Sequence, residues 1–262
     1  MRIIVLVKQI LDPAGITIRR DKERIFINRE EYILGPGSKA AIEAALRLKG
    51  AGGGTPQVVA LSLGEARADD ALREAMAMGC DEAYLLSDEA FKEADISMAA
   101  QIVAAAVEKL GGADLIVAGR RSGDTAAGQM APRLAEALGY AGLTDAYTLA
   151  LEAGNLQATR RWGDGYAGLK TALPAVVSVA PEAFPPRYAH GARIMDAYRQ
   201  WAVTTWNAGD LGLAEEALQP RLRFRSETFP APQEMGERFR GEADSVAQDA
   251  VTALRIQKLI GQ

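Results

Sequence analysis

The sequence predicts an α/β fold: a doubly wound, Rossmann-like parallel sheet followed by an extended C-terminal tail. Short runs rich in Val, Ile and Leu alternate with amphipathic helical segments through the first half of the 262 residues. Such alternation produces βαβ units, whose helices cover both faces of a parallel sheet. The alternation ends near residue 180. We therefore expect an α/β domain over residues 1–180 and a second region over 181–262, made of an extended arm and a terminal helix.

Four apolar segments predict the first strands of this sheet: 2–8, 57–63, 82–88 and 114–119. Their composition is typical of parallel strands that are buried on both faces. Helical spacing of apolar residues predicts helices over 38–50, 66–79 and 96–112. Each of these segments ends at a glycine, the common C-terminal cap of a helix.

The remaining segments add hairpins and a tail. Alternation about a charged turn predicts a hairpin over 16–30. After residue 139 we expect a further hairpin, followed by a last buried strand over 174–180. From residue 181 onward Pro, Arg and Gly accumulate, and helical periodicity returns only over 242–261. We expect a partner chain to cover the tail's large aromatic residues, which have no evident core of their own. They are Tyr188, Trp201, Trp206, Phe224 and Phe229.

Composition excludes several classes of function. The net charge of −4 argues against nucleic-acid binding, which needs a basic face. No apolar run reaches the roughly 18 to 20 residues of a membrane helix, and the apolar start is too short for a signal peptide. We therefore expect a cytoplasmic (bacterial or archaeal) or organelle-matrix protein. The single cysteine, Cys80, excludes an internal disulfide, and the single histidine, His190, is interpreted as a surface residue.

No catalytic motif is present. The first strand is not followed by G-x-G-x-x-G, and the sequence has neither a Walker A lysine motif nor a cluster of nucleophile and base. We expect no catalytic side chain and no metal site.

The first candidate ligand site is the stretch 114–139, which predicts a strand, a polar loop and a helix beginning near Ala126. Unpaired N–H groups and the helix dipole favour an anion at such a helix N-terminus. Gly119 allows close backbone approach, and the two arginines after it favour a phosphate. Ser122, Asp124 and Thr125 are candidate helix caps. An ordinary strand–loop–helix corner with solvated arginines explains the same pattern.

A second candidate site is LGPGSKAAIEAAL, residues 34–46. Its Gly-Pro-Gly-Ser sequence exposes backbone N–H groups at the start of a helix, near the end of the first strand. The residues alone thus indicate a ligand the size of an adenine nucleotide, and a partner chain. They name no reaction.

Five segments resemble, in order and spacing, the beta (small) subunit of electron-transfer flavoprotein. They are RIIVLVKQILDP, AAIEAALRLK, ALREAMAMGCDEAYLLSD, DLIVAGRRSGD and LPAVVSVAPEAFPPRYAHGARIM. The tail segment VTTWNAGDLGL is similar to the same family, and the resemblance weakens after about residue 213. The chain is identified as a divergent member.

The resemblance implies a heterodimer with an alpha subunit, which holds a redox-active FAD. Beta subunits of this family bind AMP in a site of their own, and a second FAD replaces AMP in electron-bifurcating members. The complex takes electrons from a flavin dehydrogenase, commonly of the acyl-CoA dehydrogenase class, and passes them to a quinone reductase or another acceptor. The alternative is a nucleotide-binding module of the same superfamily that acts as a sensor or scaffold without electron transfer.

Carried onto this sequence, the family's nucleotide contacts fall on two strand ends and on both candidate loops. They are Leu6, Gly35, Pro36, Gly37, Ser38, Leu63, Gly119, Arg120, Arg121, Ser122, Gly123, Asp124, Thr125, Gly128, Gln129 and Met130. The expected anion is the nucleotide's phosphate, held by main-chain N–H groups of residues 122–129.

The family docks its dehydrogenase through the segment that follows the last sheet strand. The matching residues here are Arg187, Tyr188, Gly191, Ile194 and Met195. Two departures from the family pattern stand out. Gly191 replaces the apolar docking side chain, and Gly35 replaces an asparagine near the nucleotide.

Overall fold

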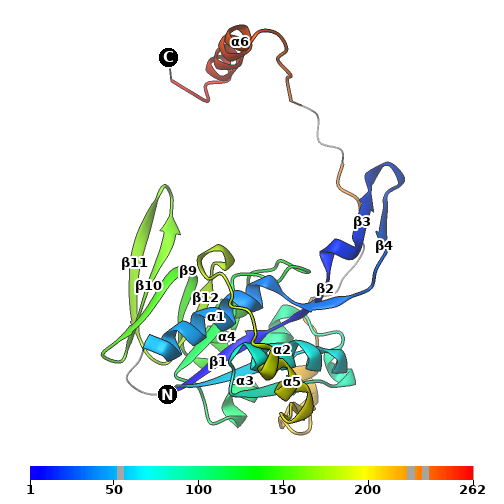
Figure 1. The fold of residues 1–262 in the computed structure, drawn as a ribbon, viewed down its shortest axis with the longest axis vertical. Coiled ribbons are helices and arrows are strands. Elements are labelled where there is room, and N and C mark those ends of the chain that lie inside the picture. Colours follow the sequence, from blue (N-terminus) through cyan, green and yellow to red (C-terminus); the bar gives the residue numbers. More distant parts are fainter. Residues whose placement is uncertain (52–55, 223–227, 232–235, 262) are drawn as a thin grey trace. The chain divides into compact units, whose positions relative to one another are not determined.

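A nine-stranded, mostly parallel sheet lies at the centre of the larger of two units in the computed structural model (Figure 1). The structure describes residues 1–51, 56–222, 228–231 and 236–261. The two units are Met1–Arg225 and Ser226–Gln262. The predicted α/β fold with a parallel central sheet is confirmed.

The strands of the large sheet are β1 (Arg2–Val7), β6 (Gln57–Leu63), β7 (Glu82–Leu86), β8 (Leu115–Gly119), β9 (Ala141–Glu152), β10 (Asn155–Trp162), β11 (Gly165–Ala172), β12 (Ala175–Val179) and β13 (Thr204–Trp206). They lie in the order β11-β10-β9-β12-β8-β1-β6-β7-β13. The helices are α1 (Pro36–Ala51), α2 (Asp69–Met78), α3 (Ile96–Lys109), α4 (Met130–Leu138), α5 (Gly191–Arg199) and α6 (Ala243–Ile256).

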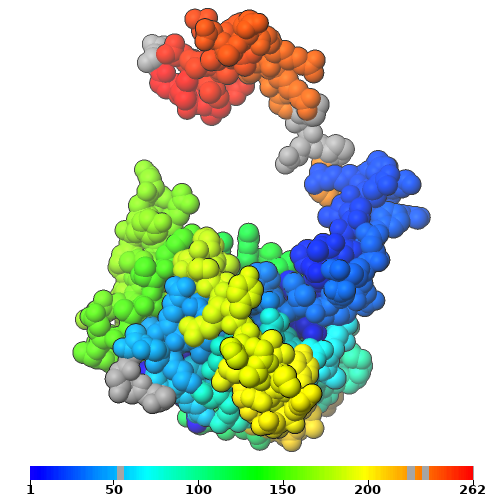
Figure 2. Space-filling view, viewed as in Figure 1, coloured from blue at the N-terminus to red at the C-terminus, as the bar shows by residue number. Residues whose placement is uncertain are grey.

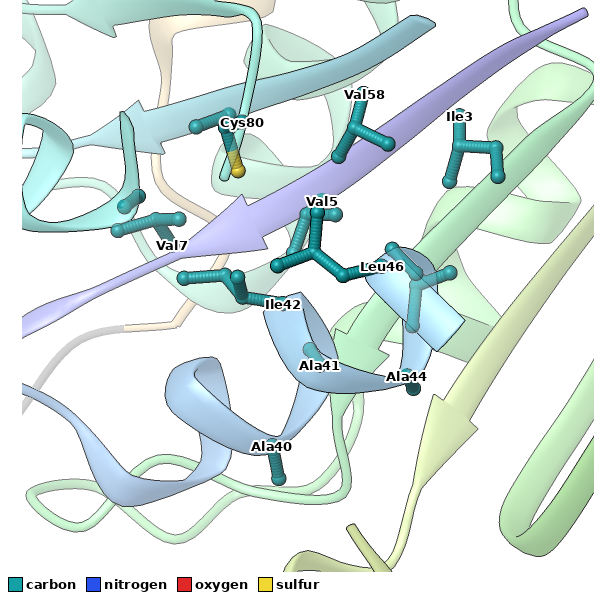
Figure 3. Packing of buried hydrophobic residues seen from close by; sticks show 14 of the residues in the cluster. Ile3, Val5, Val7, Ala40, Ala41, Ile42, Ala44, Leu46, Val58 and Cys80 are labelled. Atoms are coloured by element: carbon teal, nitrogen blue, oxygen red, sulfur yellow. The ribbon is translucent and has the colours of Figure 1, made fainter. Parts of the chain in front are cut away.

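Alternating side chains of β1 build the two halves of the core. Ile3 and Val5 point toward α1 and lie in the same buried cluster as its Ile42 and Leu46 (Figure 3). Ile4 belongs to the second cluster, which includes residues of α3 and α4. Burying an aliphatic side chain of this size contributes about 1.5 to 3 kcal/mol, so β1 stabilises both layers.

The order of the strands places a topological switch beside β1. The chain runs outward from β1 to β6 and β7, then returns through α3 to β8 on the other side of β1. The pairing of β1 with β8 stops at Val5 and Val117, so the carboxyl ends of these two strands are not paired with each other. In open α/β sheets, ligands bind in the crevice outside the strand ends at such a switch.

Smaller elements extend this scaffold. The predicted hairpin over 16–30 is confirmed as β3 (Ile16–Arg19) and β4 (Arg24–Ile27), carried by the paired strands β2 (Gln9–Leu11) and β5 (Tyr32–Leu34). The predicted last strand is β12. Instead of one hairpin after residue 139, β9, β10 and β11 form a three-stranded antiparallel meander.

Part of the tail is regular and packs on the first unit. β13 pairs in parallel with β7, and Trp206 lies against Tyr84 with ring centroids 4.6 Å apart. Trp201 packs on the buried cluster that includes α1 and α2. The expectation that these two tryptophans lack a core was therefore wrong. Long-range contacts order this segment, and no local sequence pattern records them.

The first unit consequently continues to Arg225, beyond the expected boundary at residue 180. Tyr188 is 99% exposed, as expected for a residue that needs a partner, whereas Phe224 lies outside the described residues.

The second unit contains α6, where a helix over 242–261 was predicted. None of the α6 residues is buried, and its apolar residues Val251, Leu254 and Ile256 are exposed. In the part of the chain that the structure describes, no helix combines the length and the apolarity needed to cross a membrane.

Candidate functional site

The two candidate ligand loops meet at the carboxyl edge of the sheet, where the first turn of α1 lies against the end of β8. A Cβ atom on Gly119 would lie 2.6 Å from the carbonyl carbon and oxygen of Gly37. A Cβ atom on Gly37 would lie 2.8 Å from the carbonyl oxygen of Arg121. No side chain fits either gap. Close backbone approach was predicted at Gly119, and the backbone that approaches it is that of α1.

Hydrogen bonds tie the start of α1 to the end of β1. The hydroxyl of Ser38 accepts a hydrogen bond from the amide of Lys8 at 2.9 Å, and the amide of Gly35 donates to the carbonyl of Lys8 at 3.0 Å. Pro36 stands at the first helical position, where its lack of an N–H costs nothing. The Ser38 hydroxyl thus fixes the start of α1 against the end of β1.

The helix after β8 begins later than predicted, at Met130 and not near Ala126. Ala126 and Gly128 have φ angles of 51° and 65°, which an α-helix does not tolerate. Gln129 occupies the N-cap position without a side-chain cap. The loop is therefore longer and more open than its sequence pattern indicated.

The three predicted helix caps bond within the loop, so this prediction was wrong. The hydroxyls of Ser122 and Thr125 lie 2.9 Å apart, and the Asp124 carboxylate accepts the amide of Thr125 at 2.7 Å. The carboxylate also pairs with the ammonium of Lys8 at 2.8 Å, which joins the loop to the end of β1. Partial burial raises the pKa of Asp124, but hydrogen bonds from Lys8 and Ser122 outweigh it, and the pKa falls below its usual value.

The loop leaves main-chain donors unused. Within residues 1–51 and 56–222, the amides of Ala127, Gly128 and Gln129 make no hydrogen bond to another residue. They directly precede the first turn of α4, whose amides have no intrahelical acceptor. Adjacent free N–H groups at the positive end of a helix dipole form an anion site.

The two arginines of the loop differ in their surroundings. The guanidinium of Arg120 pairs with Asp145 at 3.1 Å and with Glu182 at 3.2 Å. Glu182 also accepts the hydroxyl proton of Tyr147 at 2.7 Å. Arg121 is exposed and makes no hydrogen bond or ion pair among the residues described. Of the pair, Arg121 is the one free to reach an anion.

Leu6 and Leu63 complete this edge. They lie at the carboxyl ends of β1 and β6, which pair in parallel, and both are half-buried beside the cluster of α3 and α4. The structure thus brings all the predicted nucleotide residues to one edge of the sheet. It also adds partners that sequence reasoning missed, Lys8 above all, because ion pairs between distant segments leave no local signal.

The sequence matches the electron transfer flavoprotein domain over residues 24–211. The chain belongs to the electron transfer flavoprotein family.

Relatives in this family match the chain along most of its length. It is 35% identical over 265 residues to the caffeyl-CoA reductase-Etf complex subunit CarD of Acetobacterium woodii, which covers 99% of this chain and 100% of that subunit. It is 31% identical to the electron transfer flavoprotein subunit beta of Thermoanaerobacterium thermosaccharolyticum, with 99% and 100% covered. The acryloyl-CoA reductase electron transfer subunit gamma of Anaerotignum propionicum is 34% identical, with 76% and 74% covered.

The predicted docking residues lie in α5 and just before it. Tyr188 is fully exposed, and Ile194 and Met195 are about half-exposed. Arg187 differs, because its side chain binds Glu43 of α1. His190 caps α5: its Nδ1 accepts the amide of Ala192 at 3.3 Å, a structural role that its sequence context did not show.

Proposed function

We propose that this chain is the beta subunit of a heterodimeric electron-transfer flavoprotein. It binds AMP, or a second FAD, at the carboxyl edge of its sheet, and its alpha subunit holds the redox-active FAD. The complex passes electrons from a flavin dehydrogenase of the acyl-CoA dehydrogenase class to a quinone reductase or another acceptor. Two observations support the proposal. The chain belongs to this family, and the amides of residues 127–129, near the switch beside β1, have no acceptor among the described residues.

The chain's own groups bind and orient the nucleotide. Main-chain N–H groups of the loop hold the phosphate, Arg121 adds charge, and Leu6 and Leu63 offer apolar surface to the base. The bound flavin supplies the electron-transfer chemistry. Burial raises the pKa of the Cys80 thiol to about 12, so this group stays protonated and takes no part.

The names of two relatives support a partner that acts on CoA thioesters. One is a subunit of a caffeyl-CoA reductase-Etf complex, and the other is an electron transfer subunit of an acryloyl-CoA reductase.

Nucleotide release tests the binding role. The native complex is denatured, and the supernatant is separated by chromatography. We expect about one AMP or FAD per chain beyond the FAD of the alpha subunit. The identity of the released molecule decides between the two nucleotides, and a correctly folded complex without this nucleotide contradicts the binding role.

A visible spectrum of the complex tests electron transfer. We expect an acyl-CoA dehydrogenase and its acyl-CoA to bleach the flavin bands. A complex that carries nucleotide but shows no bleaching with dehydrogenases of this class contradicts electron transfer and favours the sensor or scaffold.

A further inference from the structure

An ion pair with a buried carboxylate joins the docking segment to α1. Glu43 of α1 is only 5% exposed. Its carboxylate accepts hydrogen bonds from Arg187, from Nε at 2.7 Å, from Nη2 at 3.3 Å and from the backbone amide at 3.3 Å. Arg47, one turn along α1, donates to the same carboxylate at 2.9 Å. Side chain and main chain of Arg187 are therefore held at one point.

Such a buried carboxylate is stable only while its partners remain. Burial raises the pKa of Glu43, but the hydrogen bonds from Arg187 and Arg47 outweigh burial and lower it. Glu43 is thus charged at neutral pH. A buried carboxylate that loses a cationic partner is left with less compensation for its charge, so Glu43 opposes movement of Arg187 away from α1.

A separate set of contacts holds α5 on α2. Arg193 of α5 donates to the carbonyl oxygens of Met76 at 2.7 Å and Ala77 at 3.1 Å, at the C-terminal end of α2. In return Arg73 of α2 donates to the carbonyl oxygens of Ala197 and Trp201, at the end of α5. Each cation thus lies at the negative end of the other helix. In the space-filling view α5, in yellow, covers part of the cyan surface of α2 (Figure 2).

These two attachments act on different parts of the segment. The arginines of α2 and α5 hold residues 191–201. The Glu43–Arg187 pair holds the middle of the connection over 184–190, whose ends are anchored in the core by buried Phe184 and by Ala189. That connection carries Tyr188, whose side chain is 99% exposed in the part of the chain that the structure describes. Only the backbone on either side of Tyr188 determines where its ring stands.

We propose that Glu43 and Arg187 are positioning residues that hold Tyr188 ready for the electron-donating dehydrogenase. The proposal rests on the proposed function and on the docking segment that the family resemblance predicts. It assigns Arg187 a different part from the one that the family resemblance implies: Arg187 holds the segment from inside and does not contact the partner. A segment that is ordered before binding loses less conformational entropy on binding, so docking is tighter.

Two variants of the alpha–beta complex test the pair. Glu43→Gln removes the buried charge, and Arg187→Gln removes the guanidinium from a side chain that is 46% exposed, so the second variant keeps the test valid if the first fails to fold. Lys49→Gln is the matched control, because it breaks the ion pair of α1 with Asp81 and touches nothing in the segment.

Amide hydrogen exchange measures the order of the segment directly. Pro185 and Pro186 carry no amide hydrogen, so the readout is the amide of residue 187, which Glu43 binds in the wild type. We expect its exchange to rise by about tenfold in both variants, with residues 192–201 within about twofold of the wild type. Lys49→Gln leaves both regions unchanged. Unchanged exchange at residue 187 in both variants overturns the positioning role.

Kinetics separate positioning from general loss of structure. The concentration of an acyl-CoA dehydrogenase, reduced by its acyl-CoA, is varied. The rate at which the flavin of the complex bleaches is measured at each concentration. We expect the KM for the dehydrogenase to rise about five- to tenfold with kcat within about twofold, and nucleotide content to stay constant. Arg187→Lys keeps the charge but not the forked geometry of the guanidinium. Its KM should therefore lie between that of the wild type and that of Arg187→Gln.

Two results would contradict the inference in different ways. Faster exchange with an unchanged KM shows that order at 184–190 does not serve docking, which overturns the proposal. A wild-type complex that takes no electrons from the dehydrogenase contradicts the proposed function instead, and the exchange rates then still support or overturn the positioning of the segment.

Discussion

Gly119 shows how a missing side chain can shape a site. Its missing side chain lets the first turn of α1 lie against β8, which brings the two loops of the candidate site together. The sequence pattern identified the glycine correctly but could not identify the backbone that approaches it, because Gly37 lies 82 residues earlier in the chain (119 − 37).

Replacement of Gly119 by alanine should therefore destabilise the whole domain. The new methyl group would meet the backbone of Gly37 at 2.6 Å, and neither backbone can move without disturbing β8 or α1. We expect the free energy of unfolding in urea to fall by about 2 kcal/mol or more, with loss of the bound nucleotide. Gly168→Ala is the control, since nothing lies within 4 Å of its added methyl group. Equal stability of the two variants would contradict the tight contact.

The ion pair between Lys8 and Asp124 predicts a pH dependence. Because the pKa of Asp124 is depressed in the folded protein, its contribution is complete above the unfolded value of about 3.9 and disappears as the pH falls through the lower folded value. We expect Asp124→Asn to lower the free energy of unfolding at pH 7 by less than about 1 kcal/mol, since the pair is partly exposed. The difference should vanish in strong acid. A difference that persists there has another cause.

The two loop arginines should differ in their effect on nucleotide affinity. Arg120 is already paired with Asp145 and Glu182, whereas Arg121 is exposed and unpaired among the residues that the structure describes. We expect Arg121→Ala to weaken binding by about 1 to 2 kcal/mol and Arg120→Ala to weaken it less. Calorimetric titration of the nucleotide-stripped complex with AMP measures both. A larger loss for Arg120→Ala would show that its ion pairs open on binding.

Strands and long helices were predicted well because their signals are local. β1, β6, β7 and β8 are apolar runs, and α1, α2 and α3 have helical spacing. The predicted glycine cap is found at the end of α2, whereas α1 continues past Gly50 to Ala51 and α3 ends at Lys109. The start of α4 was misjudged because an alanine, Ala126, takes a left-handed conformation that composition does not reveal. β13 and α5 were missed because partners far along the chain stabilise them: β7 for the strand and α2 for the helix.

The first residue of α5 offers a test of docking by this helix. A Cβ atom on Gly191 would meet nothing within 4 Å, and Ile194 and Met195 follow on the next turn. Gly191→Leu should leave the fold intact and add an apolar side chain to the face. We expect the KM for an added acyl-CoA dehydrogenase to fall about tenfold or more, as for a buried interface residue worth about 2 kcal/mol.

Gly191→Ser is the matched control for that variant, because it adds a small polar group at the same backbone position. An unchanged KM for Gly191→Leu would contradict docking through this face. If the dehydrogenase also remains bound through gel filtration at moderate salt, the complex is a fixed assembly that does not need a transient contact.

The boundary between the two units decides which truncation can test pairing with a partner chain. A cut after Ala180 would remove β13, which covers the edge of β7, and α5, whose Ala197 is fully buried. The remaining chain would expose a strand edge and the apolar face of α2, so it should aggregate for reasons unrelated to its partner. A cut after Arg225 follows the boundary of the units and leaves these contacts in place.

Residues 1–225 should therefore fold and bind nucleotide but fail to pair stably with the alpha subunit. The second unit holds α6, none of whose residues is buried, and an exposed apolar helix face of this kind needs a partner. A permanent heterodimer is expected to bury more than about 2,000 Å², and a separate unit that clasps the partner supplies part of that area. Co-purification with tagged alpha subunit, followed by gel filtration, measures the pairing. If residues 1–225 pair at full strength, the interface lies wholly on the first unit and α6 has another role; if they fail to fold alone, the second unit stabilises this chain directly.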